Sequence, residues 1–246
     1  QETLMFFVVR AWIKREGIVE SFLVNWGIAH NFKELREIFA VKYLAPGRKE
    51  LYRAHIAAID SGYRTPEVYD FCRKIRGFVP IKGRKTVRAG ETGVIPHKRL
   101  PVDPKQQKGG LFYFLVNTSY YKQWLYYDQI NNMEPDASET WHLPIDVDGE
   151  YVKQLMSEKE VVITDRYGRR KREWRLKKGH PDNHLLDCEI YAAAIADVYG
   201  VRYLTESTNT ASSQGEAQSK TNTATKSSQG GWAINPKKPM SGWLKR

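Results

Sequence analysis

The order of the apolar segments restricts the fold of this sequence more than any other feature. Short apolar, strand-like segments and segments with helical periodicity follow one another through the first third of the chain. They are a hairpin over 4–26 with its turn at 14–17, a helix capped by Asn31 that reaches Tyr43, a strand from His55 to Asp60, a helix from Val68 to Ile75 and a strand from Phe78 to Ile81. This β-β-α-β-α-β order predicts an α/β domain with a mixed sheet.

Predicted strands and helices continue to follow one another in the middle of the chain, after a long polar segment. Residues 84–110 are polar, basic and rich in Pro and Gly, which predicts a long surface loop. Beyond it we expect a strand over Leu111 to Val116, a helix over Ser119 to Tyr127, a short helix over Gly149 to Lys159, a basic hairpin within 141–178 and a helix over His184 to Tyr199. The last helix carries apolar residues at core spacing, so one face of it should be buried.

The composition changes abruptly at Thr205. From there to about Gly231, Ser, Thr, Gln, Asn and Gly dominate, with almost no hydrophobic residues. Such a segment cannot bury enough apolar surface to offset its ordering entropy. Trp232 and Trp243 then return among Lys and Arg residues. We therefore expect a domain over 1–204, a disordered linker over 205–231 and a short docking motif over 232–246.

The net charge of +11 and the pI of about 9.5 indicate an anionic partner. Nucleic acid is the usual one, because each phosphate contact releases a counterion; a solvated basic surface is the alternative. Clustering of the basic residues favours a phosphate backbone, and the clusters are Arg73, Lys74, Arg76, Lys82, Arg84, Lys85, Arg88, and Arg166, Arg169, Arg170, Lys171, Arg172, Arg175, Lys177, Lys178. We expect no membrane span, no signal peptide, and two cysteines that remain buried reduced thiols.

Asp60 ends a predicted strand and precedes a tight turn into the next helix. In α/β sheets, ligands and catalytic groups gather at the carboxyl ends of the strands. The alternative is that Asp60 caps the following helix. Thr65 is better placed for that cap, so the sequence favours a functional role for Asp60.

Asp187 lies one turn inside the last predicted helix, at the edge of its buried face, and Asn183 or Asp182 is expected to cap that helix. A half-buried carboxylate is costly unless it meets a cation, a donor or a metal; the alternative is a carboxylate that interacts only with the helix dipole. Asp60 and Asp187 together indicate a cluster for Mg²⁺ or Mn²⁺, which prefer hard oxygen ligands. Two such ions about 4 Å apart can hydrolyse a phosphodiester.

Several other polar and aromatic residues are expected to have structural roles only. The aromatic residues around the predicted helix 119–127 could stack on bases, but aromatic stripes are more often core, and the core interpretation is preferred for Tyr113, Tyr120, Tyr121, Trp124, Tyr126 and Tyr127. The acids Asp70, Asp146 and Asp148 are expected to lie at the surface.

Five stretches resemble, in order, the motifs of the nuclease domain of lambda gpA-type phage terminase large subunits. They are residues 57–62 (AAIDSG), 68–72 (VYDFC), 81–83 (IKG), 172–174 (REW) and 183–192 (NHLLDCEIYA). The resemblance spans roughly residues 2–200. It implies an RNase H-like fold, with a mixed sheet flanked by helices, and a metal-dependent endodeoxyribonuclease that uses two Mg²⁺ or Mn²⁺ ions to cut concatemeric viral DNA.

The resemblance also implies roles for individual residues. Matched position by position, Asp60 and Asp187 become the catalytic metal ligands, and Lys82 and His184 become nearby assistants. The residues expected to contact DNA are Lys82, Arg84, Lys85, Arg170, Arg172 and Lys177.

Further expectations concern the whole protein. The family opens this domain with a strand ending Asp-x-Gln, so we expect that strand and its acid upstream of Gln1, together with an ATPase motor, since no P-loop occurs in the sequence. Expected partners are duplex DNA, a small terminase subunit and, through the docking motif, the portal of the procapsid, in the host cytoplasm. The alternatives are another RNase H-like nuclease, such as a resolvase or transposase, or a prophage remnant that only binds DNA.

Overall fold

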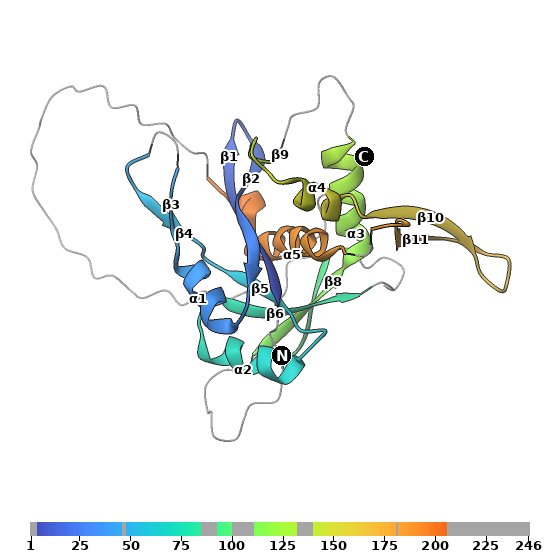
Figure 1. Cartoon of the computed structure of the whole chain (residues 1–246), viewed down its shortest axis with the longest axis horizontal. Helices are drawn as coiled ribbons and strands as arrows, with labels where there is room; N and C mark the ends of the chain where they lie inside the picture. Colours follow the sequence, from blue (N-terminus) through green and yellow to red (C-terminus); the bar gives the residue numbers. More distant parts are fainter. Residues whose placement is uncertain are drawn as a thin grey trace, which may run out of the picture.

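The fold was analysed in a computed structural model. It describes residues 4–45, 48–84, 93–99, 111–131, 140–180 and 182–205. Within these ranges it is a mixed α/β structure with several sheets and helices α1 to α5 (Figure 1). The predicted linker from 206 onward and the docking motif lie outside the described residues.

A long antiparallel hairpin forms the first part of the fold. Strand β1 (Met5–Arg15) pairs with β2 (Ile18–Ala29), so both predicted strands are confirmed and extend further than expected. Glu16 and Gly17 make the two-residue turn with φ of 52° and 80°, the left-handed conformation that matches the twist of a tight hairpin. The short strand β9 (Trp141–His142) joins β2 in parallel.

A four-stranded mixed sheet forms the second layer, in the order β5-β6-β8-β7. Its strands are β5 (Ala57–Asp60), β6 (Phe78–Arg84), β7 (Val94–Arg99) and β8 (Phe112–Asn117). Strands β5, β6 and β8 are parallel, whereas β7 is antiparallel to β8. The carboxyl ends of the three parallel strands therefore lie at one edge, and β5 brings Asp60 to that edge.

Helix α5 (His184–Tyr199) packs against both layers. In Figure 1 it lies behind the β1–β2 hairpin and beside the four-stranded sheet. Its residues Leu186, Ile190 and Ala194 are almost completely buried, which confirms the predicted core face. A buried ion pair between Arg10 of β1 and Glu189 of α5 ties the hairpin to this helix, so the helix that carries Asp187 is held on more than one side.

The smaller helices cover the edges of these layers. Helix α2 (Thr65–Lys74) connects β5 to β6 and packs Val68 and Cys72 against Phe78. Cys72 is buried and Cys188 is half-buried; both thiols are free, as predicted. None of the helices in the described ranges is both long and apolar enough to cross a bilayer.

The first helix is shorter than predicted. Helix α1 (Phe32–Ala40) begins after Asn31, whose side chain accepts a hydrogen bond from the Glu34 N–H, so the predicted cap is confirmed. The predicted end at Tyr43 is wrong, because residues from Lys42 form strand β3 (Lys42–Leu44), which pairs with β4 (Leu51–Arg53). Cross-strand pairing with a later segment thus overrides the helical pattern.

The loop predicted over 84–110 is also wrong in part. Residues 94–99 form β7, whose Val94 lies opposite Val116 of β8, and both side chains are buried. The hydrophobic pair stabilises an edge strand that its Pro and Lys content obscures in the sequence. Residues 85–92 and 100–110 lie outside the described residues.

The remaining helices differ from prediction mainly at their ends. Helix α3 (Thr118–Gln123) continues as a π-helical segment, η1 (Trp124–Ile130), beyond the predicted end. Helix α4 (Gly149–Leu155) stops before the predicted Lys159, because β10 (Glu158–Thr164) begins there and pairs with β11 (Arg170–Leu176). The β10–β11 hairpin is the basic hairpin predicted from the sequence, and it projects from the right side of Figure 1.

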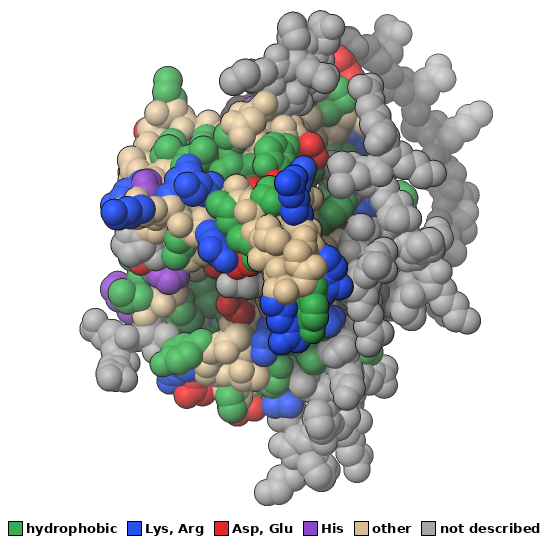
Figure 2. Space-filling view, turned by 90° about the vertical axis from the view of Figure 1, so that its right-hand side faces the viewer, with side chains coloured by type: hydrophobic (Ala, Val, Ile, Leu, Met, Phe, Trp, Pro, Cys, Tyr) green, Lys and Arg blue, Asp and Glu red, His purple; other side chains and the backbone are tan. Residues whose placement is uncertain are grey.

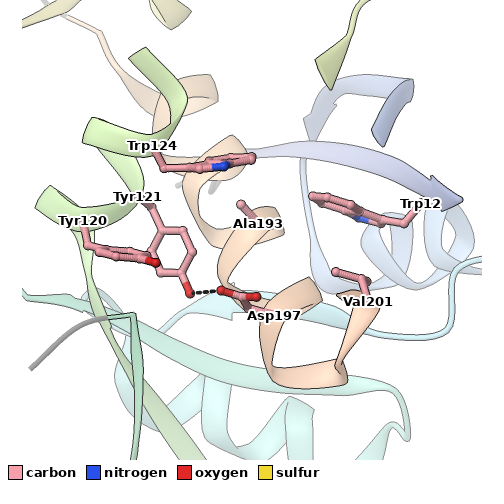
Figure 3. Close-up of a pocket in the computed structure, with 7 residues that line it drawn as sticks. All are labelled: Trp12, Tyr120, Tyr121, Trp124, Ala193, Asp197 and Val201. Carbon is pink, nitrogen blue, oxygen red and sulfur yellow. Dashed lines mark hydrogen bonds between the residues drawn. The ribbon is translucent and has the colours of Figure 1, made fainter. Parts of the chain in front are cut away.

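An aromatic pocket lies between β1, α3, η1 and α5 (Figure 3). Trp12, Tyr120 and Trp124 line it, and the Tyr121 hydroxyl donates to Asp197 at 2.9 Å. Tyr121, Trp124 and Tyr126 are buried, as the core interpretation predicts. Tyr127 is 48% exposed, so that interpretation is wrong for it; its hydroxyl instead donates to Glu160 at the surface.

Candidate functional site

Asp60 stands at the carboxyl end of β5, where solvent reaches it. The Gly62 N–H donates to Asp60 Oδ1 at 2.8 Å, and a Cβ at Gly62 would lie 3.2 Å from the same oxygen. Behind this turn, buried Ser61 bonds through its hydroxyl to the carbonyl of Ile81 on β6. The turn therefore fixes the Asp60 carboxylate at the sheet edge.

Asp60 does not cap the helix that follows it. Helix α2 begins at Thr65, and its N-cap residue is Arg64, whose side chain makes no capping hydrogen bond; the Asp60 carboxylate accepts from Gly62 instead. Thr65 is not the cap either, which corrects the prediction; its hydroxyl donates to the Ser61 carbonyl at 2.7 Å. The capping alternative for Asp60 therefore does not hold.

Asp187 lies in the first turn of α5, and its side chain is 38% exposed. Burial, together with the negative charges of Glu158 and Asp60, raises the pKa of Asp187 to about 6. Lys122 and His184 act in the opposite direction. The structure thus brings Asp60 and Asp187 close enough for their charges to interact, as the sequence predicts, although they are far apart along the chain.

The electrostatics of Asp60 follow the same pattern. Burial raises its pKa, while the Gly62 N–H and the charge of Lys82 lower it. Lys82 is exposed on β6, directly after Ile81, the register partner of Asp60. Two carboxylates with raised pKa values, one of which is affected by the charge of the other from a different element, are typical of a functional site.

Tyr191 is a residue of this site that sequence reasoning missed. It lies one turn after Asp187 on α5, and burial together with the charges of Asp60 and Asp187 holds its pKa well above the usual value. The phenol therefore stays protonated and is a hydrogen-bond donor. A Cβ on Gly83 would lie only 2.7 Å from its hydroxyl, which explains why a glycine stands in the 81–83 stretch.

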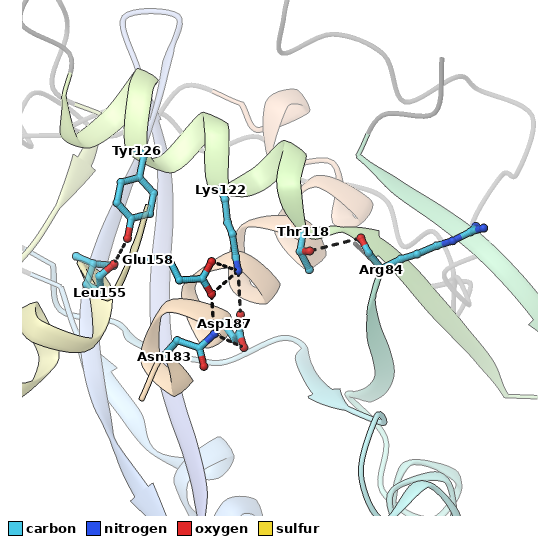
Figure 4. A network of polar contacts seen from close by, with 8 residues as sticks. All are labelled: Arg84, Thr118, Lys122, Tyr126, Leu155, Glu158, Asn183 and Asp187. Atoms are coloured by element: carbon cyan, nitrogen blue, oxygen red, sulfur yellow. Dashed lines mark hydrogen bonds and ion pairs between the residues drawn. The ribbon is translucent and has the colours of Figure 1, made fainter. Parts of the chain in front are cut away.

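A second group missed by the sequence reading lies beside Asp187 (Figure 4). Lys122 of α3 forms an ion pair with Glu158 of β10, with its Nζ 2.7 Å from each carboxylate oxygen. Asn183 is the N-cap residue of α5, as predicted, but its amide donates to Glu158 and Asp187 instead of capping the helix. Lys122 and Glu158 lie 36 residues apart in different elements, so no local sequence pattern predicts their ion pair.

The predicted assistant His184 and the predicted DNA contacts Arg84 and Lys85 lie in different parts of the structure. His184 stacks on Phe6 with ring centroids 4.5 Å apart and is 52% exposed at the start of α5. Arg84 ends β6, where its carbonyl accepts a hydrogen bond from Thr118. Lys85 lies outside the described residues.

The β10–β11 hairpin presents the remaining predicted DNA contacts. Arg170 and Arg172 lie on β11 and are exposed, and Arg172 pairs with Glu160 at 3.4 Å. Lys177 follows the strand, with its backbone N–H bound to the Ser157 carbonyl. Figure 2 looks onto the side from which the hairpin projects, and Lys and Arg side chains gather on that face.

The spare acids have structural partners. Asp70 pairs with Arg73 on the surface of α2, and Asp148 caps α4 and accepts from Trp26. Over the described part of the chain, no three side chains of the His, Cys, Asp and Glu types are grouped tightly enough to hold a metal ion. Asp60 and Asp187 are thus an acidic pair there, with hard oxygen donors suited to Mg²⁺ or Mn²⁺.

Comparison with known proteins identifies the family. The model of the terminase large subunit gpA endonuclease domain matches residues 5–209. Searches of the curated proteins and of the solved structures found no match. The matched range contains both acids, the β10–β11 hairpin and the Lys122–Glu158 pair, and extends over most of the sequence. The chain therefore belongs to the terminase large subunit gpA endonuclease domain family, which has a nuclease role in phage DNA packaging.

Proposed function

We propose that this domain cuts concatemeric viral duplex DNA by metal-dependent phosphodiester hydrolysis, in the cytoplasm of the host. The observation that carries the proposal is the approach of Asp60 and Asp187, two carboxylates with raised pKa values, at the carboxyl edge of the sheet. A divalent cation would compensate the burial that raises both pKa values, and it would relieve the repulsion by Asp60 that adds to the shift of Asp187. The RNase H-like expectation for the fold agrees with an acidic pair at this edge.

Asp60 and Asp187 would hold the metal through carboxylate oxygens. Bound Mg²⁺ or Mn²⁺ would supply an activated water and stabilise the leaving oxygen. The turn at Gly62 keeps Asp60 at the sheet edge, and the Asn183 amide donates to Asp187.

Other side chains would bind the DNA around this pair. Lys82 is exposed and close enough to lower the pKa of Asp60, and it would contact a phosphate oxygen. The protonated hydroxyl of Tyr191 can donate a hydrogen bond next to both acids. The exposed arginines of the β10–β11 hairpin would bind the backbone away from the cut, because phosphate contacts position a duplex without reading its sequence.

The full-length subunit would combine this domain with an ATPase motor. Its proposed partners are a small terminase subunit, and the portal of the procapsid through residues 232–246. These partners follow from the family resemblance alone.

The experiment that tests the proposal is plasmid cleavage by the full-length subunit in Mg²⁺ or Mn²⁺. Asp60→Asn and Asp187→Asn should reduce cleavage to background while DNA binding persists, because each change removes a charged ligand. Asp70→Asn is the matched control, since Asp70 is an exposed acid paired with Arg73, and it should cut like the wild type. Near-normal cleavage by a pure Asp60 or Asp187 variant would contradict the assignment.

A further inference from the structure

We propose that Glu158 is a positioning residue for the metal site, because it keeps the Lys122 ammonium from capturing the Asp187 carboxylate. The inference rests on the proposed function, in which Asp187 holds a metal. It concerns three side chains that come from α3, β10 and α5 and meet at one point (Figure 4).

The distances show how Lys122 is shared between the two acids. Its Nζ lies 2.7 Å from both oxygens of Glu158 and 3.8 Å from Asp187 Oδ1. The first contact is a bidentate ion pair; the second is a weaker, longer one. Lys122 thus lies near a metal ligand while most of its charge is balanced by Glu158.

Burial makes this balance necessary. The side chains of Lys122 and Glu158 are 9% and 5% exposed, so neither charge has ready access to water. Removal of one partner from a buried pair leaves the other charge uncompensated. If Glu158 were neutral, the flexible Lys122 stem would let the ammonium move the short distance to Asp187, the next carboxylate within reach.

A lysine fully paired with Asp187 would oppose metal binding. The ammonium would occupy carboxylate lone pairs that a divalent cation needs, and it would repel that cation. Asn183 supports the present arrangement, because its amide donates to Glu158 Oε1 at 2.8 Å and to Asp187 Oδ2 at 3.3 Å. Glu158 therefore accepts from both donors beside Asp187 and holds them in place.

The competing explanation is that the ion pair only joins α3 to β10. The two explanations differ for a variant that loses both charges. If Glu158 acts by restraining Lys122, the combined change Glu158→Gln with Lys122→Met removes the competitor along with its restraint, and metal binding recovers. If the pair is only a structural link, the double variant binds metal no better than the single variant.

The test is Mn²⁺ binding to the 246-residue chain, measured by the EPR signal of free Mn²⁺ during titration, with thermal denaturation to check the fold. We expect Glu158→Gln to raise the Kd by about tenfold, as for other residues that orient metal ligands. The double variant should lie within about threefold of wild type. Unchanged binding by Glu158→Gln, or a double variant as weak as the single one, would overturn the proposal.

Two further outcomes keep the test decisive. If Glu158→Gln does not fold, the double variant is judged alone, and a tenfold loss in it overturns the proposal. Asp187→Asn separates this inference from the proposed function. Wild-type Mn²⁺ affinity in Asp187→Asn, or no binding by the wild type, would refute the metal site itself; loss in Asp187→Asn with no loss in Glu158→Gln would refute only the role of Glu158.

Discussion

Replacement of Gly83 by alanine should destabilise the domain through the contact between β6 and α5. The new Cβ would lie 2.7 Å from the Tyr191 hydroxyl and 2.9 Å from Thr118 Cγ2, both well inside van der Waals contact. Overpacking of this kind costs about 1–3 kcal/mol. For a domain of this size, each kcal/mol lowers the Tm by about 2–4 °C, so we expect a decrease of roughly 2–12 °C.

The same contacts predict which second substitutions should reverse the loss of Tm in Gly83→Ala. Without the hydroxyl, the nearest ring atom of residue 191, Cζ, would lie 3.7 Å from the new Cβ, which is an ordinary contact. Tyr191→Phe should therefore restore part of the Tm lost in Gly83→Ala. Adding Thr118→Ser should restore a further part, because it removes Cγ2.

Differential scanning calorimetry of these variants provides the assay, with Gly149→Ala as the matched control. A Cβ at Gly149 meets no atom within 4 Å, so its Tm should stay close to wild type. An unchanged Tm for Gly83→Ala, or no recovery when Tyr191→Phe is added, would refute the packing described for this part of the site.

Three further predictions concern the hairpin, the acid and the tail. Arg170→Glu with Arg172→Glu should weaken duplex binding and flatten its salt dependence in fluorescence anisotropy; an unchanged salt slope would exclude the hairpin as a phosphate-binding element. The raised pKa of Asp187, about 6, means that the folded state binds a proton more tightly than the unfolded state. Without metal, this stabilisation is present at low pH and is lost as the pH rises through 6, so Asp187→Asn should raise the Tm at pH 7 and should change it less at pH 4; equal changes at both pH values would contradict the shift. Deletion of residues 232–246 from the full-length subunit should lower packaging into procapsids without affecting plasmid cleavage; normal packaging with reduced cleavage would assign the tail to the nuclease instead.

Local sequence patterns correctly predicted the helices and strands that are determined by contacts among their own residues or with close sequence neighbours. The β1–β2 hairpin follows from two strand-like segments around a tight turn, and α5 follows from its apolar spacing. Helix α1 begins at the predicted cap because Asn31 acts through a neighbouring N–H. In each case the contacts that determine the element join residues close together in the sequence or recur at regular spacing. A local sequence pattern can therefore predict the element.

The failures have a different physical origin. Helix α1 ends where β3 begins to pair with β4, and β7 forms because it pairs with β8. Neither pairing can be predicted from the residues of the segment alone. The same holds for the site. The positions of Asp60 at a strand end and of Asp187 in the first turn of a helix could be predicted from the sequence, and their role as metal ligands stays a prediction. Glu158 and Lys122 meet only through the tertiary fold.

A divalent metal shared by Asp60 and Asp187 is tested most directly by the anomalous scattering of Mn²⁺ in crystals of the protein soaked with the ion. A shared site predicts an anomalous peak in contact with carboxylate oxygens of both Asp60 and Asp187, and the loss of that peak in Asp187→Asn. Mn²⁺ bound only elsewhere, or a peak that persists unchanged in Asp187→Asn, would contradict it.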